Sequence, residues 1–238
     1  QKFLAISSLT ARPPLGNVVI GAFLALTRVD FAHYQLVTTL FSSVVFLPAA
    51  LLSRQFLVRA GVGERSAIAT LAVLAMLNPL VIQNATFAWT KLPSALFVLA
   101  GFYFFLRLQT SPNAVSVAPL CGACLAAGML AHYSAGPYLV VLSLVWITLG
   151  WRTRYATGWQ RTTALLALSG TLVLATWFAW SLAVYGVDGT LLSNSSVTAA
   201  DPHAETQFAN IILILRDTFV PHFLRPLDPA LIAQASPW

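Results

Sequence analysis

A few polar side chains at the edges of apolar runs are the candidates for chemistry in this sequence. Arg12, Lys91 and His132 each lie close to the end of an apolar run. Side chains of these types hold phosphate groups through charge and hydrogen bonds. Trp89 and Tyr133 are next to this set in the sequence and could line the same substrate. Together they predict a binding site for a phosphate-bearing molecule.

Each of these residues also has a plainer interpretation. Lys91 close to Trp89 is typical of a membrane interface, where lysine extends its ammonium toward water. His132 and Tyr133 equally suit a polar turn between two helices. Arg12 equally suits an interfacial anchor. Both interpretations therefore stay open for the whole set.

Chemistry at such a site also needs a carboxylate that accepts or orients a proton. Asp30 is the early candidate, although an aspartate between two helices is more often a helix cap. Asp201, His203 and Glu205 alternate along a late segment and could bind a metal if that segment were extended. A solvated loop is the stronger interpretation there. We therefore assign no metal ligand and no certain cofactor, and the question of a divalent metal stays open.

Cys121 and Cys124 form a CxxC motif inside an apolar stretch. Redox or metal chemistry would require solvent access and further ligands. Their neighbours are small and instead predict a surface for close packing between helices: Gly122, Ala123, Ala126, Ala127 and Gly128.

The composition predicts an integral membrane protein. Of the 238 residues, 58% are hydrophobic and 8% are charged, whereas a soluble domain carries about 25% charged residues. The net charge of +6 is dispersed between apolar runs, which argues against nucleic acid as a partner. The runs are continuous rather than alternating, so the spanning elements should be helices and not barrel strands.

Six apolar runs meet or approach the length of about 20 residues that a spanning helix needs. They predict an all-α, polytopic transmembrane bundle of about six spanning helices over residues 35–185. The runs are Gln35–Ser53, Ser66–Gln83, Leu92–Leu108, Val115–Ala131, Gly136–Gly150 and Thr162–Tyr185.

Basic residues mark alternate connections between these runs. The connections after residue 53, near residue 107 and after residue 150 carry seven arginines and one acid, Glu64. By the positive-inside rule these three connections are cytoplasmic. Residues 84–91, residues 132–135 and the stretch after residue 185 are then external.

Two external segments flank the predicted bundle. Residues 1–34 contain the run Leu15–Leu26, which is too short to span and predicts a helix in the outer interface, with Pro13 and Pro14 at its start. Residues 186–238 predict an external loop and a second interfacial segment. Because the chain starts at Gln1 and ends at Trp238 without closing an element, we expect a truncated fragment.

The order of the elements is distinctive. An Arg-Pro-Pro-Leu segment opens the short interfacial helix, and a spanning helix and a basic turn follow. Next come the stretch NPLVIQNATFAWTKLPSALFVLAGFYFFLR, the hairpin CLAAGMLAHYSAGPYLVVL and a Trp-rich helix. Over about residues 10–185 this order resembles the GT-C superfamily of membrane glycosyltransferases. The most similar branch is that of the protein O-mannosyltransferases and the lipid A aminoarabinose transferase.

The resemblance implies a GT-C-like fold in the plasma (inner) membrane. It implies sugar transfer from a polyprenyl-phosphate-linked donor to an acceptor lipid, glycan or protein on the non-cytoplasmic face. The family's catalytic acid lies in the first external loop, yet residues 1–12 contain no Asp or Glu, so that acid is expected upstream of residue 1. Relatives often carry His or Lys where this chain has Arg12, and an acid where it has Lys91.

A transporter, a flippase or a non-catalytic lipid-binding subunit is the alternative. Transporters keep ionisable groups at mid-membrane and often show repeated halves. Here the predicted spans hold almost no ionisable residue, and the polar groups gather at the outer boundary. A lipid-linked sugar donor and membrane lipid are therefore the expected partners.

Overall fold

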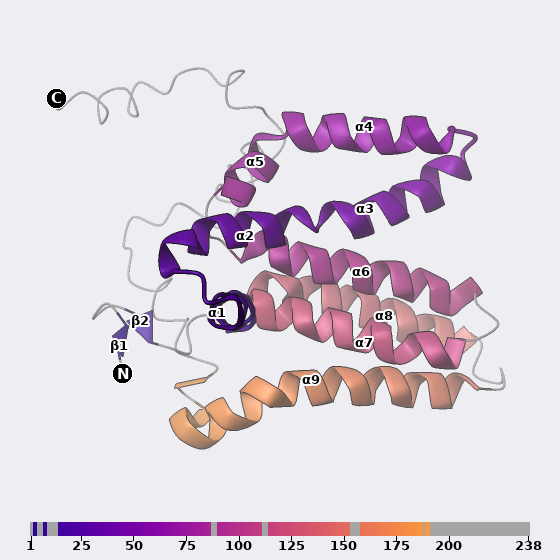
Figure 1. The fold of residues 1–238 in the computed structure, drawn as a ribbon. Coiled ribbons are helices and arrows are strands. Elements are labelled where there is room, and N and C mark those ends of the chain that lie inside the picture. The colour runs from indigo at the N-terminus through magenta and orange to yellow at the C-terminus, as the bar shows by residue number, and fades with distance from the viewer. Residues whose placement is uncertain are drawn as a thin grey trace, which may run out of the picture.

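The computed structural model describes residues 2–3, 7–8, 14–86, 90–110, 114–152, 158–187 and 189–190. These residues are almost entirely helical (Figure 1). In this part of the chain the only strands are the short β1 (Lys2–Phe3) and β2 (Ser7–Ser8), which pair antiparallel. The predicted all-helical class is confirmed.

The helices follow one another through short connections. The first group is α1 (Leu15–Thr27), η2 (Phe31–His33), α2 (Tyr34–Ser43), α3 (Phe46–Ser53) and the π-helical turn η3 (Arg54–Val58). The second group is α4 (Glu64–Leu77), α5 (Pro79–Thr86), α6 (Lys91–Thr110) and α7 (Ala114–Ala131). The last group is η4 (Tyr133–Ala135), α8 (Gly136–Arg152) and α9 (Trp159–Val187).

Several of these stretches are long and apolar enough to cross a membrane, as the composition predicted. A further span arises if the bent pair α4–α5 crosses as one unit. Within the described residues the five continuous stretches are Phe31–Val58, Lys91–Thr110, Ala114–Ala131, Tyr133–Gly150 and Trp159–Val187.

One predicted span is not continuous. The expected single helix over Ser66–Gln83 bends by 73° between α4 and α5. Asn78 precedes Pro79, and a residue in that position disfavours helical backbone; its φ and ψ are −81° and 112°. Its Oδ1 accepts hydrogen bonds from the backbone N–H groups of Leu80 (2.9 Å) and Val81 (3.3 Å). Asn78 thus ends α4 and caps α5.

Replacing Asn78 with alanine should destabilise the protein by about 1 kcal/mol or more, because two N–H groups of α5 lose their acceptor. In a lipid environment no water replaces the lost acceptor. Thermal unfolding in detergent measures the loss. Asn78→Ser keeps a capping oxygen and should lose less than half as much. Equal losses in both variants would contradict the capping role.

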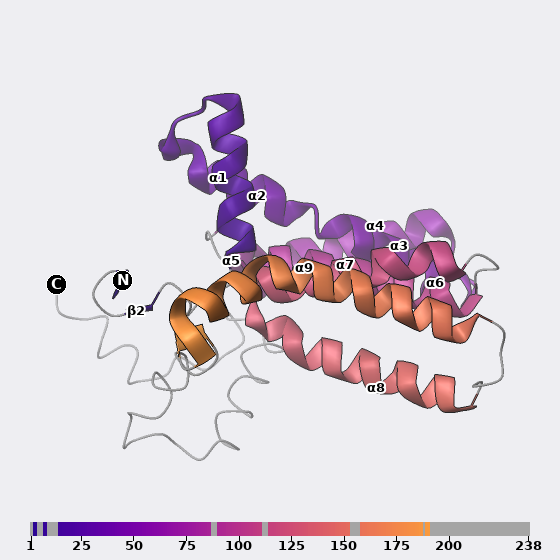
Figure 2. The same ribbon diagram turned by 90° about the horizontal axis from the view of Figure 1, so that it is seen from below.

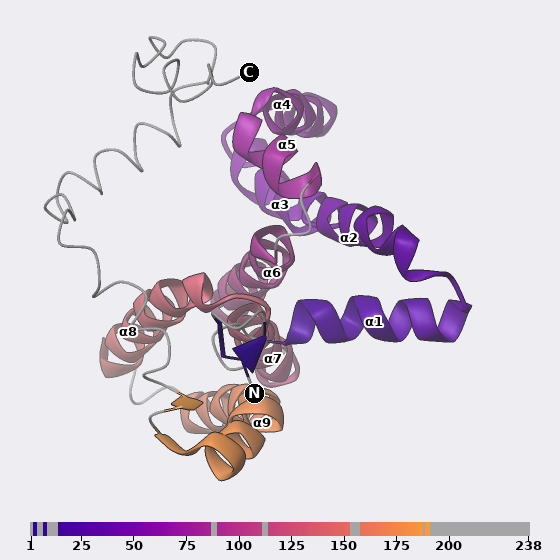
Figure 3. The same ribbon diagram turned by 90° about the vertical axis from the view of Figure 1, so that its left-hand side faces the viewer.

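α7 is the centre of the bundle and packs against both α6 and α9 (Figures 1 and 3). Its contact surface is rich in small residues. A Cβ atom at Gly122 would overlap the carbonyl oxygen of Leu166 and the hydroxyl of Ser169 in α9. A Cβ atom at Gly128 would lie 3.0 Å from Val98 in α6. The predicted close-packing surface is confirmed.

The CxxC motif belongs to the same core. Cys121 is fully buried, in a cluster with Phe105, Ala118 and Leu125. Its Sγ lies 3.4 Å from the carbonyl oxygen of Gly101 in α6, to which the thiol donates. A thiol held in this way fills space between two helices, which agrees with packing rather than redox chemistry.

α1 lies across the other helices. Figure 1 views α1 along its axis while α6, α7 and α9 run across the page, and Figure 2 shows the same crossing from below. The helix predicted over Leu15–Leu26 is confirmed as α1, which begins directly after Pro14. If the long helices span a bilayer, this crossing puts α1 parallel to the membrane plane. Its interfacial location stays a prediction.

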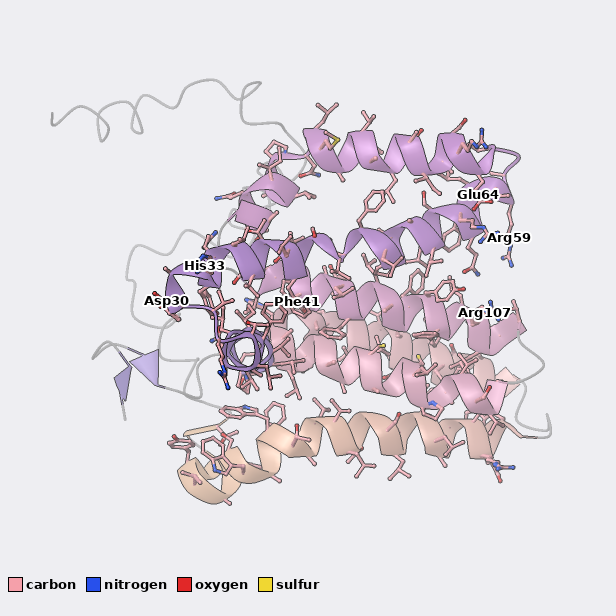
Figure 4. The ribbon with its side chains drawn as sticks, viewed as in Figure 1. Asp30, His33, Phe41, Arg59, Glu64 and Arg107 are labelled. Carbon is pink, nitrogen blue, oxygen red and sulfur yellow. The ribbon has the colours of Figure 1, made fainter. Side chains whose placement is uncertain are left out.

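Charged side chains gather at the two ends of the bundle (Figure 4). Arg59, Glu64 and Arg107 lie at one end, and Asp30 and His33 lie at the other. The described residues of the basic connections lie at one end, as predicted, since α8 ends and α9 begins there too (Figure 1); which membrane face that end meets stays a prediction. We call it the arginine end, because its described residues include Arg54, Arg59, Arg65, Arg107 and Arg161. The opposite end is the Lys91 end, because α6 begins there.

Candidate functional site

Two contacts fix the position of α1, one to the residue before α6 and one to the start of α2. Gly16 in the first turn of α1 packs against Thr90, so closely that a Cβ atom would lie 2.8 Å from the threonine methyl group. The hydroxyl of Tyr34, at the start of α2, donates to Oδ1 of Asn17 at 2.8 Å. These contacts bring the beginning of α1 beside Lys91, the exposed first residue of α6.

The turn η4 fixes the ring of His132 at the same end. The Nδ1 atom of His132 accepts from the backbone N–H of Ser134 at 3.1 Å, and the Ser134 hydroxyl lies 2.9 Å from the same atom. Because Nδ1 accepts from a backbone donor, the neutral ring carries its proton on Nε2. The backbone N–H of His132 donates to the carbonyl of Gly128 at 3.0 Å, so the turn is continuous with α7.

Lys91 and this turn form one pocket of about 260 Å³. Lys91 and Ser94 contribute from α6, and Ser134 and Tyr138 contribute from η4 and the start of α8. The Ser94 hydroxyl is buried and donates to the carbonyl of Gly128 at 3.0 Å, which holds α6 against α7 below the pocket. We call this cavity the Lys91 pocket.

A larger apolar pocket of about 520 Å³ lies beside it, between α2–α3, the bent pair α4–α5 and α6. Its lining is almost wholly hydrocarbon, with Phe46, Leu74 and Leu92 among the larger side chains. Ala95 and Leu99 line both cavities. These two α6 residues therefore border both a cavity that carries an ammonium group and a cavity whose lining is almost wholly apolar.

This pair of cavities suits an amphiphilic anion. The Lys91 ammonium and the Ser134 hydroxyl supply donors for phosphate oxygens. The lining of the apolar pocket suits a hydrocarbon chain, because it is hydrocarbon apart from Ser42, Ser43 and Asn78. No residue of the arginine end lines either of these two cavities.

Comparison with family models, with curated proteins and with solved structures found no match for this chain. The resemblance to GT-C glycosyltransferases stays a prediction.

The structure brings together some of the residues predicted for the site. Lys91 lines the pocket, and His132 holds Ser134, which also lines it. Tyr133 is half-buried in the same turn and faces Trp177 of α9.

Other predicted residues lie outside the part of the chain that the structure describes. These are Arg12, Trp89 and the metal candidates Asp201, His203 and Glu205. Within the described ranges, no group of three or more His, Cys, Asp or Glu side chains could hold a metal ion.

Asp30 is not brought to the Lys91 pocket. It is exposed and occupies the N-cap position of η2, without a capping hydrogen bond from its side chain. Figure 3 shows α1 projecting away from α7, and Asp30 follows the far end of that helix. At ~1.5 Å per residue the length of α1 alone separates it from Gly16 by about 20 Å. The carboxylate therefore lies too far away to act on a group held by Lys91.

The sequence prediction did not include Ser94, Ala95, Leu99 or Tyr138. Ser94 and Ala95 follow Lys91 by three and four residues, so all three share one helix face. From that spacing, Ser94 and Ala95 could have been predicted to line the same cavity as Lys91. Nothing in the local pattern around Tyr138 indicates its approach to α6.

Proposed function

We propose that this chain functions in a membrane glycosyltransferase that uses a polyprenyl-phosphate-linked sugar. The supporting observation is that Ala95 and Leu99 border both the Lys91 pocket and the apolar pocket. A polyprenyl phosphate has the same division, because an anionic head is joined directly to a long hydrocarbon chain. In this proposal the head occupies the Lys91 pocket, and the isoprene units nearest the head occupy the apolar pocket of about 520 Å³.

In the proposed reaction an acceptor oxygen forms a bond to the anomeric carbon of the sugar while the bond from that carbon to the phosphate oxygen breaks. Negative charge then grows on the departing polyprenyl phosphate. The Lys91 ammonium stabilises that charge. The acceptor's proton passes to a carboxylate, which the GT-C resemblance puts in the external loop ahead of Arg12.

The orientation of the reaction follows from the distribution of arginines. The arginine end is the cytoplasmic side by the positive-inside rule. The Lys91 end is then non-cytoplasmic, and the perpendicular α1 lies at the boundary of that leaflet. Donor and acceptor meet there, where the acceptor can be a lipid, a glycan or a protein.

Lys91→Gln should weaken the binding of polyprenyl phosphate about 10-fold, because a charge-assisted hydrogen bond contributes about 1.5–3 kcal/mol. The probe is polyprenyl phosphate without a sugar, titrated against the chain in phosphatidylcholine nanodiscs. Arg161→Gln removes an equal charge from the arginine end and should bind as the wild type does. Equal affinity in the wild type and Lys91→Gln would contradict the phosphate role of Lys91.

A second measurement separates the transferase from the non-catalytic alternative. The full-length gene product is supplied with a panel of polyprenyl-phosphate-linked sugars, and released polyprenyl phosphate is measured. Release that depends on an acceptor supports the transferase. Binding that depends on Lys91, without release from any donor of the panel, would instead support a lipid-binding subunit.

A further inference from the structure

A third cavity, at the arginine end, has a different chemistry. It measures about 470 Å³ and lies between η3 and the last turns of α6. Arg54 and Arg59 contribute from the η3 side, and Tyr103 and Arg107 contribute from α6. Figure 4 shows Arg59 and Arg107 at this end, on neighbouring elements. We call this cavity the arginine pocket.

Helix spacing explains how the arginine pocket gathers its charges. Arg54, Gln55, Val58 and Arg59 line it with the spacing i, i+1, i+4 and i+5, which is one helix face. The π-helical turn η3 covers Arg54–Val58, and π-turns inside helices occur frequently at functional sites. Tyr103, Arg107 and Thr110 present the matching i, i+4 and i+7 face of α6.

The pocket carries an excess of positive charge. Nε of Arg54 lies 3.1 Å from Oε1 of Glu64, and both side chains are about half exposed. That is the only ion pair found within the described residues, so neither Arg59 nor Arg107 has a carboxylate partner there. Arg107 does donate from Nη1 to the Tyr103 hydroxyl at 3.5 Å, which orients it along α6. Two guanidinium groups are thus available to one anion.

An apolar surface continues from the pocket toward the middle of the bundle. Leu47 and Leu51 precede Arg54 by seven and three residues, so they lie on the same helix face, deeper in the predicted membrane. Leu51 lines the pocket itself, and Leu47 is 61% exposed. A soluble anion would make no use of this surface, whereas the acyl chains of a lipid would cover it.

We propose that the arginine pocket binds the phosphate headgroup of an anionic phospholipid in the leaflet at that end. Arg59 and Arg107 hold the phosphate, since guanidinium groups match phosphate oxygens in pairs of hydrogen bonds. The acyl chains lie over Leu51 and Leu47. Basic pockets between transmembrane helices on the cytoplasmic side commonly take such headgroups. This site is separate from the Lys91 pocket and does not depend on the transferase proposal.

The test counts the lipids retained by the full chain after extraction from nanodiscs of mixed phosphatidylcholine and phosphatidylglycerol, using native mass spectrometry. Wild type should retain phosphatidylglycerol in preference to phosphatidylcholine. The R59Q/R107Q variant should lose that preference by at least about 10-fold, because each arginine near an anionic headgroup adds to binding. The matched control is R65Q/R161Q, which removes two charges from the same end outside the pocket and should retain the preference.

Three outcomes would overturn the proposal. An equal loss in both double variants would show only a general surface potential. An unchanged preference in R59Q/R107Q would remove the site. Displacement of phosphatidylglycerol from the wild type by millimolar inorganic phosphate would indicate a site for a soluble anion. R59K/R107K is the control for misfolding of the glutamine variant. It keeps both charges and should retain most of the preference for phosphatidylglycerol.

Discussion

Gly122→Ala should lower the free energy of unfolding by about 3 kcal/mol or more, the upper part of the range for overpacked cores. The added methyl group would overlap the carbonyl oxygen of Leu166 and the hydroxyl of Ser169. The carbonyl belongs to the backbone of α9, so it cannot avoid the methyl group by a change of rotamer, as a side chain can. Relief requires α7 and α9 to separate along their shared surface.

Gly21→Ala is the matched control for this change. Gly21 is also helical, but no heavy atom of another part of the described structure lies within 4 Å of the position that its Cβ would occupy. Alanine favours the helix by about 1 kcal/mol over glycine, so this variant should be neutral or slightly more stable. Chemical unfolding of both variants in detergent measures the difference. Similar stabilities would mean that α7 and α9 are not in close contact.

Ala95→Trp should reduce the affinity for polyprenyl phosphate by at least about 10-fold, because Ala95 lines both cavities and the indole ring would fill space that the head needs beside Lys91. A bound lipid would then have to give up either its head contact or its chain contact. The change leaves Lys91 and every other charge in place. The variant therefore tests whether the position that both cavities share matters for binding, independently of the ammonium group.

Ala69→Trp is the matched control, since Ala69 is an exposed residue of α4 that lines neither cavity. It should bind polyprenyl phosphate as the wild type does. Titration in nanodiscs measures both variants, and the thermal unfolding of each reports whether it has folded. A folded Ala95→Trp protein with wild-type affinity would show that a bound lipid does not pass between the two cavities.

The long helices could be predicted from the sequence because each depends on a local property, the length of an apolar run. The short α1 also followed from local signals, since Pro14 precedes a run too short to span. The break in the second span had a local signal as well, the Asn78-Pro79 pair. A hydropathy profile alone does not detect this break, because only two residues, asparagine and proline, interrupt the apolar run.

The candidate site depended on contacts that no local pattern contains. Lys91 and Ser134 are far apart in the sequence and meet only because α6 and α7 pack closely at Gly128. Asp30 and Lys91 were both predicted to be external, and both lie at the Lys91 end of the bundle. However, the length of α1 keeps them apart. Sequence reasoning thus assigned residues to an end of the bundle, and only the packing decided which of them share a cavity.

The bend between α4 and α5 determines how a lipid would reach this protein. Leu74 and Met76 line the apolar pocket, yet they are 61% and 73% exposed, so the pocket opens sideways from the bundle. A hydrocarbon chain that enters there leaves one apolar medium for another and gains little hydrophobic free energy. In the proposed function the tail therefore confines the lipid to diffusion in the two dimensions of the bilayer, and selectivity among membrane lipids would come from the head at Lys91.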